Sequence, residues 1–531
     1  MPRFFNTAGP IKPDLHYYIP AFQRLDWDEI QMLIASQKYF LIHAPRQTGK
    51  TSALLEMAQA LNDAGTYKAL YVNVETAQVT RNDIARGMAT ICDSIGAHAD
   101  VTGVEPTLQA LARTVIAQTP AERALTQLLA QWSQMSDKPI VLFIDEADAL
   151  VGDTLISLLR QIRAGYTQRP HAFPQSIVLC GLRDIKDYRI AHSNGDIITG
   201  GSAFNIKAES LRMGNFTEPE VIALYRQHTQ ETGQIFADTI FADVWADTAG
   251  QPWLVNALAY EMTWKDKAAR DRSTTLTLAH YQAARERLIA SRATHLDQLA
   301  DKLLEPRVHR IISPMLSGDQ TNLLLPHDDL QYCEDLGLIA RKPHAHISNR
   351  IYREIIPREL TAVTQDTMIQ QSSWYLTADH QLDMAKLLSA FQQFFRENSD
   401  SWIERFDYKE AGPQLLMQAF LQRIINGGGR LNREYALGRR RTDLMIEWPL
   451  DPECGFDGPV QRIVIELKIQ RGDLQALITK GVAQTCAYAD GFGAEQAHLV
   501  IFNRMPETTW DEKIWQRTVD SDTRQVVVWG C

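Results

Sequence analysis

Residues 39–61 limit what this chain can fold into more than any other stretch. An apolar run from Tyr39 to His43 leads into a loop that ends in Gly49, Lys50 and Thr51, and a helical pattern of apolar residues follows. A strand, a loop and a helix in this order are what a phosphate-binding loop requires, because loop amides and a helix N-terminus surround an anion. The stretch therefore predicts an α/β nucleotide-binding core.

The loop itself assigns individual roles to its residues. Lys50 is expected to reach the β- and γ-phosphates, and Thr51 to hold Mg²⁺. Ala44 stands where the motif usually begins with glycine, a mild departure because Gly49, Lys50 and Thr51 carry most of the chemistry. ATP and Mg²⁺ are the predicted cofactors, and the predicted nucleotide-binding residues of the loop are Ala44, Pro45, Arg46, Gln47, Thr48, Gly49, Lys50 and Thr51.

An acidic pair supports the same prediction. Asp145 and Glu146 follow the apolar run 139–144, roughly a hundred residues after the loop. Asp145 would hold Mg²⁺ through water, and Glu146 would orient the water that attacks the γ-phosphate. Two acids after a strand otherwise mark a helix N-terminus, where carboxylates are favoured. Their place after a phosphate-binding loop favours ATP hydrolysis.

Two further segments resemble parts of known ATPases. Arg183 follows the apolar strand 177–181, where sensor residues of AAA-type ATPases lie; a local pair with Asp184 or Asp187 is the alternative. The tripeptide ending in Pro252 resembles the Gly-x-Pro signature of STAND and ORC-type ATPases. This resemblance implies an AAA-like core with a helical lid, and it implies that Pro252 lies near the nucleotide.

The N-terminal segment carries a related resemblance. Tyr17 and Tyr18 lie in a stretch similar to the one that such ATPases place against the adenine. Stacking on the base would be the physical reason, and plain packing of buried aromatic rings is the alternative.

A second concentration of charge lies near the C-terminus. Asp443 leads a strand-like run to Trp448, and Glu466 and Lys468 lie two residues apart in another apolar strand. Residues two apart on a strand project to the same side. Two carboxylates and an amine suit Mg²⁺-assisted phosphodiester hydrolysis. A structural salt bridge is the alternative, because buried charges also pair for stability.

These residues resemble the active-site signature of the PD-(D/E)XK nuclease superfamily. Thr442 replaces the usual proline, which is not a ligand. The resemblance implies Asp443 and Glu466 as metal ligands, Lys468 as a catalytic group, and Gln484, on a predicted helix 474–490, as support for the lysine.

One part of that signature is missing from the predicted first core helix, which begins at Pro413. In the superfamily this helix often supplies a metal-binding glutamate, but here it offers glutamines, so Glu410 and Glu434 are the candidates. Five nearby arginines form either a solvated turn or a grip on phosphates: Arg430, Arg433, Arg439, Arg440 and Arg441.

The chain of 531 residues is too long for one core. The expected organisation is α/β and multidomain, with these parts: N-terminal arm 1–25, AAA-like P-loop core 26–210, helical lid 211–295, winged-helix-like module 296–360, connector 361–405, and an α/β restriction-endonuclease-like PD-(D/E)XK domain 406–531. The second helix of the winged-helix-like module carries four acids, which repel phosphates, so a structural or regulatory role is favoured over DNA binding there.

Composition restricts the partners. The net charge of −10 argues against a generally basic surface, so any nucleic-acid contact must be local. The six cysteines form no paired metal motif, and a reducing cytoplasm fits them. No apolar run reaches the length of a membrane span.

Taken together, the chain is similar to bacterial AAA-like ATPases of the STAND/ORC type fused to a PD-(D/E)XK nuclease-like domain. The resemblance implies an ATP-regulated, Mg²⁺-dependent endonuclease acting on nucleic acid, with DNA expected, in defence against foreign DNA, and a homo-oligomer through the AAA-like core. The alternatives are a STAND-type regulator whose C-terminal domain binds nucleic acid or a protein without cutting, and a factor of DNA repair or mobile elements. The intact set of Asp443, Glu466 and Lys468 favours cutting.

Overall fold

The computed structural model describes residues 3–184, 189–191, 197–199, 206–291, 302–303, 305–316, 325–342, 344–356, 375–377, 379–403, 412–425, 429–437, 440–451, 455–470, 472–503, 505, 507–521 and 523–531. The chain forms two compact units. The first unit contains Met1–Arg292 and Cys333–Ala340, and the second contains Ala293–Tyr332 and Arg341–Cys531. Among the helices described, none is long and apolar enough to cross a bilayer.

A five-stranded parallel sheet organises the first unit, in the order β2-β3-β4-β1-β7. The strands are β1 (Tyr39–His43), β2 (Lys68–Asn73), β3 (Ile140–Asp145), β4 (Ser176–Gly181) and β7 (Lys207–Arg212). The sequence predicted β1, β3 and β4 and missed β7, which also carries the sheet past the expected boundary at residue 210. Two short strands, β5 (Arg189–Ala191) and β6 (Ile197–Thr199), pair with each other.

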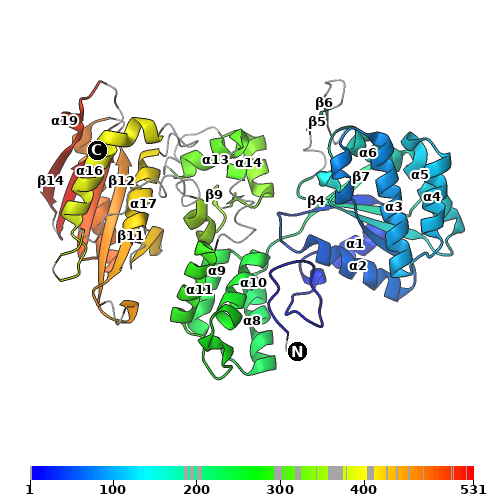
Figure 1. Cartoon of the computed structure of the whole chain (residues 1–531), viewed down its shortest axis with the longest axis horizontal. Coiled ribbons are helices and arrows are strands. Elements are labelled where there is room, and N and C mark those ends of the chain that lie inside the picture. The colour runs from blue at the N-terminus through cyan, green and yellow to red at the C-terminus, as the bar shows by residue number, and fades with distance from the viewer. Residues whose placement is uncertain are drawn as a thin grey trace. The chain divides into compact units, whose positions relative to one another are not determined.

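Helices cover both faces of this sheet (Figure 1). Side chains alternate between the faces, so that Leu142 joins one apolar cluster and Phe143 the other. One face packs on α1 (Trp27–Ala35) and α2 (Lys50–Ala64). The other face packs on α3 (Ile84–Thr102), α4 (Leu108–Gln118), α5 (Ala121–Met135) and α6 (Gly152–Ala164). Strands buried on both faces explain the continuous apolar runs of the sequence.

The segment after β7 is helical, as predicted. It contains α8 (Glu218–Thr232), α9 (Phe241–Thr248), α10 (Pro252–Tyr260), the π-helical turn η7 (Glu261–Lys265) and α11 (Leu278–Ala290). Tyr225 lies at the centre of its core and donates a hydrogen bond to the carbonyl of Val255. Its role as a lid remains a prediction.

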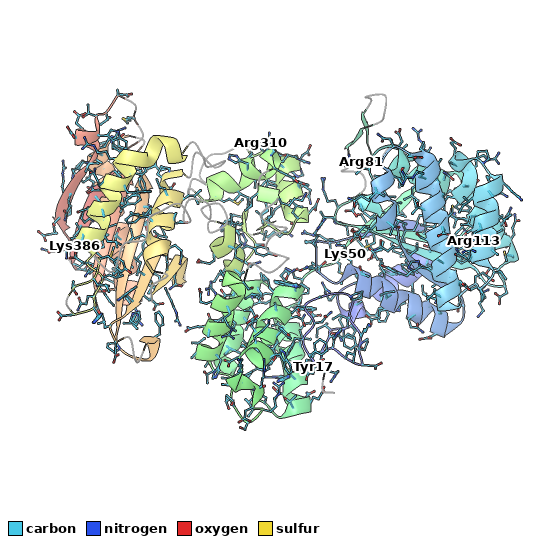
Figure 2. All side chains as sticks on the ribbon, viewed as in Figure 1. Tyr17, Lys50, Arg81, Arg113, Arg310 and Lys386 are labelled. Atoms are coloured by element: carbon cyan, nitrogen blue, oxygen red, sulfur yellow. The ribbon has the colours of Figure 1, made fainter. Side chains whose placement is uncertain are left out.

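The N-terminal arm packs into the same core. Tyr17 is fully buried, and its ring lies among those of Phe5 and His228. The hydroxyl of Tyr17 is 3.2 Å from Nδ1 of His228. Of the two interpretations of this residue, packing is therefore confirmed. Tyr17 is a core residue rather than an exposed platform for a base (Figure 2).

Two helices and two short strands follow the helical segment, in the predicted order. They are α13 (Pro306–Leu316), α14 (His327–Asp335), β8 (Ile339–Ala340) and β9 (His346–Ile347). Arg307 of α13 forms a 2.9 Å ion pair with Asp329 of α14. Asp329 thus joins the two helices, and the winged-helix identity of this module remains a prediction.

A mixed six-stranded sheet organises the second unit, in the order β10-β11-β12-β13-β15-β14. The strands are β10 (Arg430–Leu437), β11 (Arg440–Pro449), β12 (Val460–Ile469), β13 (Gln496–Phe502), β14 (Trp515–Asp520) and β15 (Gln525–Gly530). The first three pair antiparallel, and β13 and β15 continue parallel to β12. The sequence predicted β11 and β12 and missed β10, β14 and β15.

Helices also cover both faces of this second sheet. On one face, α18 (Leu474–Phe492) packs through Ile478 and Val482 against Leu499. On the other face, Phe391 of α16 (Met384–Ile403) contacts Phe502 at a ring separation of 6.2 Å. The remaining helices are α17 (Gly412–Ile425) and the short α19 (Trp510–Lys513). The described elements of this domain run in the order helix, strands, helix, strand, while the nuclease-like identity of the domain remains a prediction.

The structure changes one interpretation of the arginine-rich segment. Arg430 and Arg433 lie on β10, and Arg440 and Arg441 lie on β11, so four of the five arginines lie on strands rather than in a turn. Arg439 falls outside the described residues, as does Glu410.

Candidate functional site

The phosphate-binding loop lies between β1 and α2, where the backbone turns sharply. Gln47 has a φ of 56° and Gly49 a φ of 93°, both left-handed. Residues of this kind turn successive N–H groups toward one hollow, which suits an anion. A side chain at Gly49 would be strained at this φ, and its Cβ would lie 3.2 Å from the guanidinium of Arg24. Glycine is therefore required here by the backbone itself.

Lys50 begins α2 and curves back over the loop that precedes it. Its side chain is nearly buried, at 8% exposure, and Nζ donates to the carbonyls of Ala44 at 2.9 Å and Pro45 at 3.1 Å. Figure 2 labels Lys50 in its place on the first unit. The amine thus lies against the hollow in which the loop amides converge, which is where a phosphate chain binds such a loop.

Thr51 and Asp145 meet at the end of β3. The hydroxyl of Thr51 donates to Oδ2 of Asp145 at 2.7 Å, and the hydroxyl of Tyr71 donates to the same oxygen at 3.1 Å. Asp145 is completely buried. Hydroxyl and carboxylate oxygens are ligands that Mg²⁺ prefers, so this donor set fits a nucleotide-bound magnesium ion. The structure brings the predicted pair together from residues 94 positions apart.

Glu146 follows Asp145 in a left-handed conformation, with a φ of 55°. Burial raises the pKa of its carboxyl, and the neighbouring charge of Asp148 adds to the shift. A carboxylate with a raised pKa is a stronger base toward a bound water molecule. The role of Glu146 in hydrolysis remains a prediction.

Asp148 is a site residue that the sequence reasoning missed. Its Oδ2 accepts a hydrogen bond from the amide of Leu182 at 2.8 Å, just beyond the end of β4. A Cβ at Gly181 would lie 2.6 Å from Oδ1 of Asp148, so only glycine permits this approach. A glycine that ends an apolar strand was the signal available in the sequence.

Arg183 has a partner far along the chain. Its Nε lies 3.4 Å from Oδ2 of Asp335, a carboxylate that is only 1% exposed. The sequence suggested a γ-phosphate, Asp184 or Asp187 instead, and Asp187 lies outside the described residues. A distant pair of this kind follows from tertiary structure and leaves no local signal in the sequence.

The segment Cys333–Ala340 lies against the carboxyl ends of three neighbouring strands. Besides Arg183 beyond β4, it holds Arg212 of β7, whose Nη1 is 3.0 Å from Oε1 of Glu334. A Cβ at Gly337 would lie 2.9 Å from the side chain of Pro45, just after β1. Ligands of open α/β sheets bind at this edge. The segment and a nucleotide would therefore be neighbours.

The Gly-Gln-Pro tripeptide also reaches the phosphate-binding loop, through its middle residue. Nε2 of Gln251 donates to the carbonyl of Gln47 at 3.4 Å, while its Oε1 accepts from the amide of Leu254 at 2.6 Å and caps α10. Pro252 takes the first position of α10, where a proline loses no hydrogen bond. The tripeptide thus contacts the loop through Gln251, and the proximity of Pro252 to a nucleotide stays a prediction.

The C-terminal candidate site lies where β11 and β12 end their pairing. Leu444 is opposite Ile465, and the next residues along the two strands are Asp443 and Glu466. The amide of Asp443 is 3.4 Å from Oε2 of Glu466, and the amide of Leu467 donates to Oδ2 of Asp443 at 2.7 Å. The two carboxylates are thus brought together by strand register.

Lys468 completes this cluster and is tied to one of the acids. Its Nζ lies 2.6 Å from Oε1 of Glu466, which is 3% exposed. Burial, and after it the charge of Asp443, raises the pKa of Glu466 to about 8. The pKa of Lys468 is raised as well, because the attraction of Glu466 and Asp443 outweighs the effect of burial. A divalent cation between the two carboxylates would relieve their repulsion.

The supporting residues of this site are partly described. α18 packs against β12, and the ring hydroxyl of Tyr488 on α18 interacts electrostatically with Lys468. Oε1 of Gln484, on the same helix, is buried and has no hydrogen-bond partner among the described residues. The side chain of Glu434 is not described, and no group of three His, Cys, Asp or Glu side chains suited to a metal occurs in the described part of the chain.

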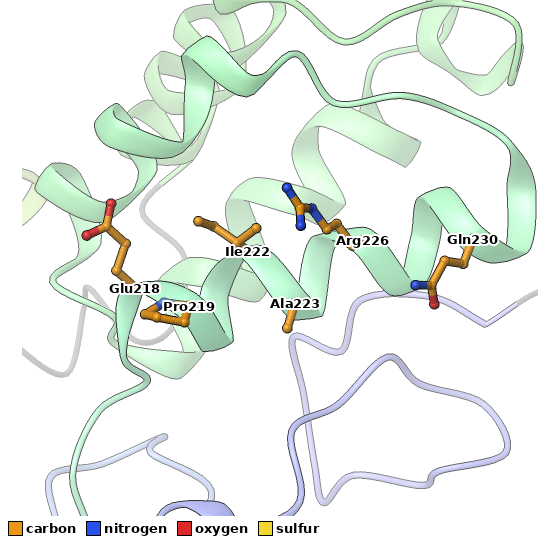
Figure 3. A pocket seen from close by; sticks show the side chains of 6 residues that line it. All are labelled: Glu218, Pro219, Ile222, Ala223, Arg226 and Gln230. Atoms are coloured by element: carbon orange, nitrogen blue, oxygen red, sulfur yellow. The ribbon is translucent and has the colours of Figure 1, made fainter.

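A surface hollow of about 470 Å³ lies on α8 of the first unit. Figure 3 shows the six side chains that line it, all from α8. None of them is a predicted site residue; they are Glu218, Pro219, Ile222, Ala223, Arg226 and Gln230.

Comparisons with known proteins bear on the first unit. A family model described as an AAA domain matches residues 34–188. The search of curated proteins gave no match. Among solved structures, a Walker-type ATPase of Pyrococcus abyssi is 12% identical with a TM-score of 0.44, covering 66% of this chain and 99% of its own.

Two other solved structures are similar at a lower level. A Thermotoga maritima RuvB variant is 14% identical with a TM-score of 0.34, covering 64% of this chain and 98% of its own. Cdc6p from Pyrobaculum aerophilum is 14% identical with a TM-score of 0.33, covering 66% of this chain and 97% of its own.

Proposed function

We propose that this chain, whose residues 34–188 are an AAA P-loop ATPase domain, is a nucleotide-regulated, Mg²⁺-dependent endonuclease acting on DNA. The observation that carries the proposal is the meeting of Asp443, Glu466 and Lys468 at the paired ends of β11 and β12. Glu466 is buried, and a buried carboxylate beside a second carboxylate costs free energy unless the two acids are paired or bind a ligand. A metal-dependent phosphodiesterase site would account for this arrangement of charged groups.

The residues of this cluster fit a magnesium ion. Two carboxylates are enough, because Mg²⁺ commonly keeps several waters and takes further oxygens from phosphate groups. When bound, the ion would activate water and neutralise charge that develops on the phosphate. Asp443 and Glu466 would hold it, Lys468 would orient the nucleophile or the scissile phosphate, and Gln484 would support Lys468 from α18.

Regulation by nucleotide is the second part of the proposal. The segment Cys333–Ala340 lies against the strand ends that carry Arg183, Arg212 and Pro45. The chain continues from this segment, at Arg341, into the unit that contains Asp443. Nucleotide bound at the same edge can therefore influence the start of the connection to the nuclease-like domain. A homo-oligomer through the AAA domain and a role in defence against foreign DNA belong to the same proposal.

The test uses the purified full chain with plasmid, linear and single-stranded DNA, with and without Mg²⁺ and ATP. Cutting is expected only with Mg²⁺, and Asp443→Ala is expected to abolish it. Cutting that survives in Asp443→Ala would overturn the nuclease assignment. Cutting that is indifferent both to nucleotide and to Lys50→Ala would overturn the regulation instead.

A second candidate is a STAND-type regulatory ATPase whose C-terminal domain binds nucleic acid or a protein without cutting. Two observations favour it: Lys468 is already paired with Glu466, and the described residues supply no third metal ligand. Retention of labelled DNA or RNA by the chain, with no cutting under any of the conditions above, would support this candidate.

A further inference from the structure

Arg24 joins three segments of the first unit. It lies between η1 (Ala21–Gln23) and α1, and its guanidinium donates through Nη1 to the carbonyl of Thr48 at 2.6 Å. Nη2 donates to the carbonyl of Gly214, in the connection between β7 and α8. The guanidinium also lies over the ring of Phe216, 4.9 Å from its centre. One side chain thus connects the phosphate-binding loop to the start of the helical segment.

The contact with Thr48 is one of a set that engages the carbonyls of the loop. Lys50 donates to the carbonyls of Ala44 and Pro45, and the hydroxyl of Thr48 also donates to that of Pro45. Gln251 donates to the carbonyl of Gln47 at 3.4 Å, near the limit for such a bond. The carbonyls of Gln47 and Thr48 therefore accept hydrogen bonds from Gln251 and Arg24, which lie outside the loop.

Holding a carbonyl also sets the direction of the next amide. A trans peptide is planar, so its C=O and the following N–H point in opposite directions. The Arg24 contact with the Thr48 carbonyl therefore directs the amide of Gly49 away from Arg24 and toward the hollow of the loop. In the same way, the hydrogen bond from Gln251 to the Gln47 carbonyl directs the amide of Thr48 toward the hollow of the loop. These amides are the groups that bind phosphate oxygens in such a loop.

We propose that Arg24 is a positioning residue for nucleotide phosphates: it fixes the Thr48 to Gly49 peptide so that its N–H faces the phosphates, and it ties this peptide to the connection between β7 and α8. Arg24 acts through the backbone and does not itself contact the nucleotide. The inference concerns the ATPase domain alone and stands whether or not the second unit cuts nucleic acid.

The surroundings agree with a charged guanidinium in this role. Burial lowers the pKa of Arg24 to about 10, and the nearby carboxylate of Glu220 opposes that shift, so the group stays charged at neutral pH. A charged donor forms a stronger bond to a carbonyl than a neutral one. Lysine offers one nitrogen in place of the planar fork, and it cannot hold both carbonyls in the same way.

The experiment measures the Kd of the full chain for ATP and, by competition, for tripolyphosphate, in Arg24→Ala, Arg24→Lys and the unaltered chain. Loss of one charge-assisted hydrogen bond corresponds to about a tenfold change in Kd. We expect Arg24→Ala to weaken both ligands about tenfold and Arg24→Lys to weaken them less. The apparent KM for ATP should rise with little change in kcat. Arg113→Ala, an exposed arginine on α4 (Figure 2), is the control and should change nothing.

Two results would overturn the proposal. A folded Arg24→Lys or Arg24→Ala chain with unchanged Kd for both ligands would show that Arg24 serves stability only. A loss of affinity for ATP that spares tripolyphosphate would place its effect at the base or sugar rather than at the phosphates. No step depends on cutting, so failure of the nuclease proposal would leave this test intact.

Discussion

The two candidate sites each contain a largely buried lysine, but the two lysines have different partners. Lys50 donates to neutral carbonyls five and six residues before it, within its own loop. Lys468 forms a 2.6 Å ion pair with Glu466, which in turn meets Asp443 of a neighbouring strand. The first arrangement follows from a short stretch of backbone. The second exists only when β11 and β12 pair in one register.

This difference indicates how each site can fail. A local loop tolerates changes elsewhere in the chain, provided that its own turn and helix form. A site made from two strands depends on the whole sheet, because a slip of one residue sends side chains to the opposite face. The second site is therefore the one that should respond to changes in the stability of its unit.

The largest expected effects come from removing each lysine. Lys50→Met should lower ATP hydrolysis, and Lys468→Met should lower DNA cutting, each by about a hundredfold to a thousandfold, because each loses one positively charged group at its reacting phosphate. Both activities are measured for both variants. Lys468→Met should leave ATP hydrolysis unchanged. If it instead lowered hydrolysis as strongly as Lys50→Met does, the sites would not be separate.

The next effect concerns pH and the second sheet. His498 is buried on β13, accepts a hydrogen bond from Nε1 of Trp529, and has its pKa lowered by burial from 6.5 to about 4. The folded state therefore favours the neutral ring, and the stability present above pH 6.5 is lost as pH falls toward 4. The loss is about 3 kcal/mol in total.

Hydrogen exchange of the β13 amides between pH 7 and pH 4 measures this loss. His498→Asn keeps an acceptor near Trp529 and does not titrate, so its dependence on pH should be weaker. Equal dependence in the two proteins would contradict the assignment to His498.

A smaller effect is expected at Gly49, where φ is 93°. Gly49→Ala should raise the Kd for ATP about tenfold, because an L residue in the left-handed region costs about 1–2 kcal/mol. Gly65→Ala is a matched control: Gly65 also has a positive φ, of 74°, but it ends α2 away from the loop. It should lower stability without changing the Kd, and a similar rise in Kd in the two variants would refute a local effect at the loop.

The smallest effect is expected at Ala44, where the motif usually has glycine. Ala44 is fully buried, and its amide donates to the carbonyl of Gly181 at 3.3 Å. Ala44→Gly should change stability by less than about 1 kcal/mol and ATP hydrolysis by less than about twofold. A tenfold gain in hydrolysis would show that the alanine restrains the loop.

The sequence predicted those parts of the fold that carry their own local signal. The apolar strands β1, β3 and β4 and the loop at Gly49 to Thr51 were recognisable because strand, turn and helix follow one another within a few residues. β7 was missed because its residues, Lys207–Arg212, are mostly polar and include no apolar run, as suits a strand at the edge of the sheet.

In the two sites, too, the sequence predicted only the contacts for which it carries a local signal. Asp145 with Thr51, and Asp443 with Glu466, were expected to meet, because each pair was predicted to hold one Mg²⁺. Arg183 with Asp335 and Arg24 with Thr48 were not foreseen, since 152 and 24 residues separate these partners and nothing in the intervening sequence marks them. Contacts of this kind depend on packing between elements, which a single sequence does not state.

The pairing register of β11 and β12 also limits where related chains can gain or lose residues. Ten residues connect Pro449 of β11 to Val460 of β12. Insertions or deletions within this connection would leave the pairing of the two strands unchanged. One residue added between Leu444 and Pro449, or between Val460 and Ile465, would instead separate Asp443 from Glu466. Among related chains, insertions and deletions should therefore occur in the connection. If they are missing from β11 and β12, the site itself has been under selection.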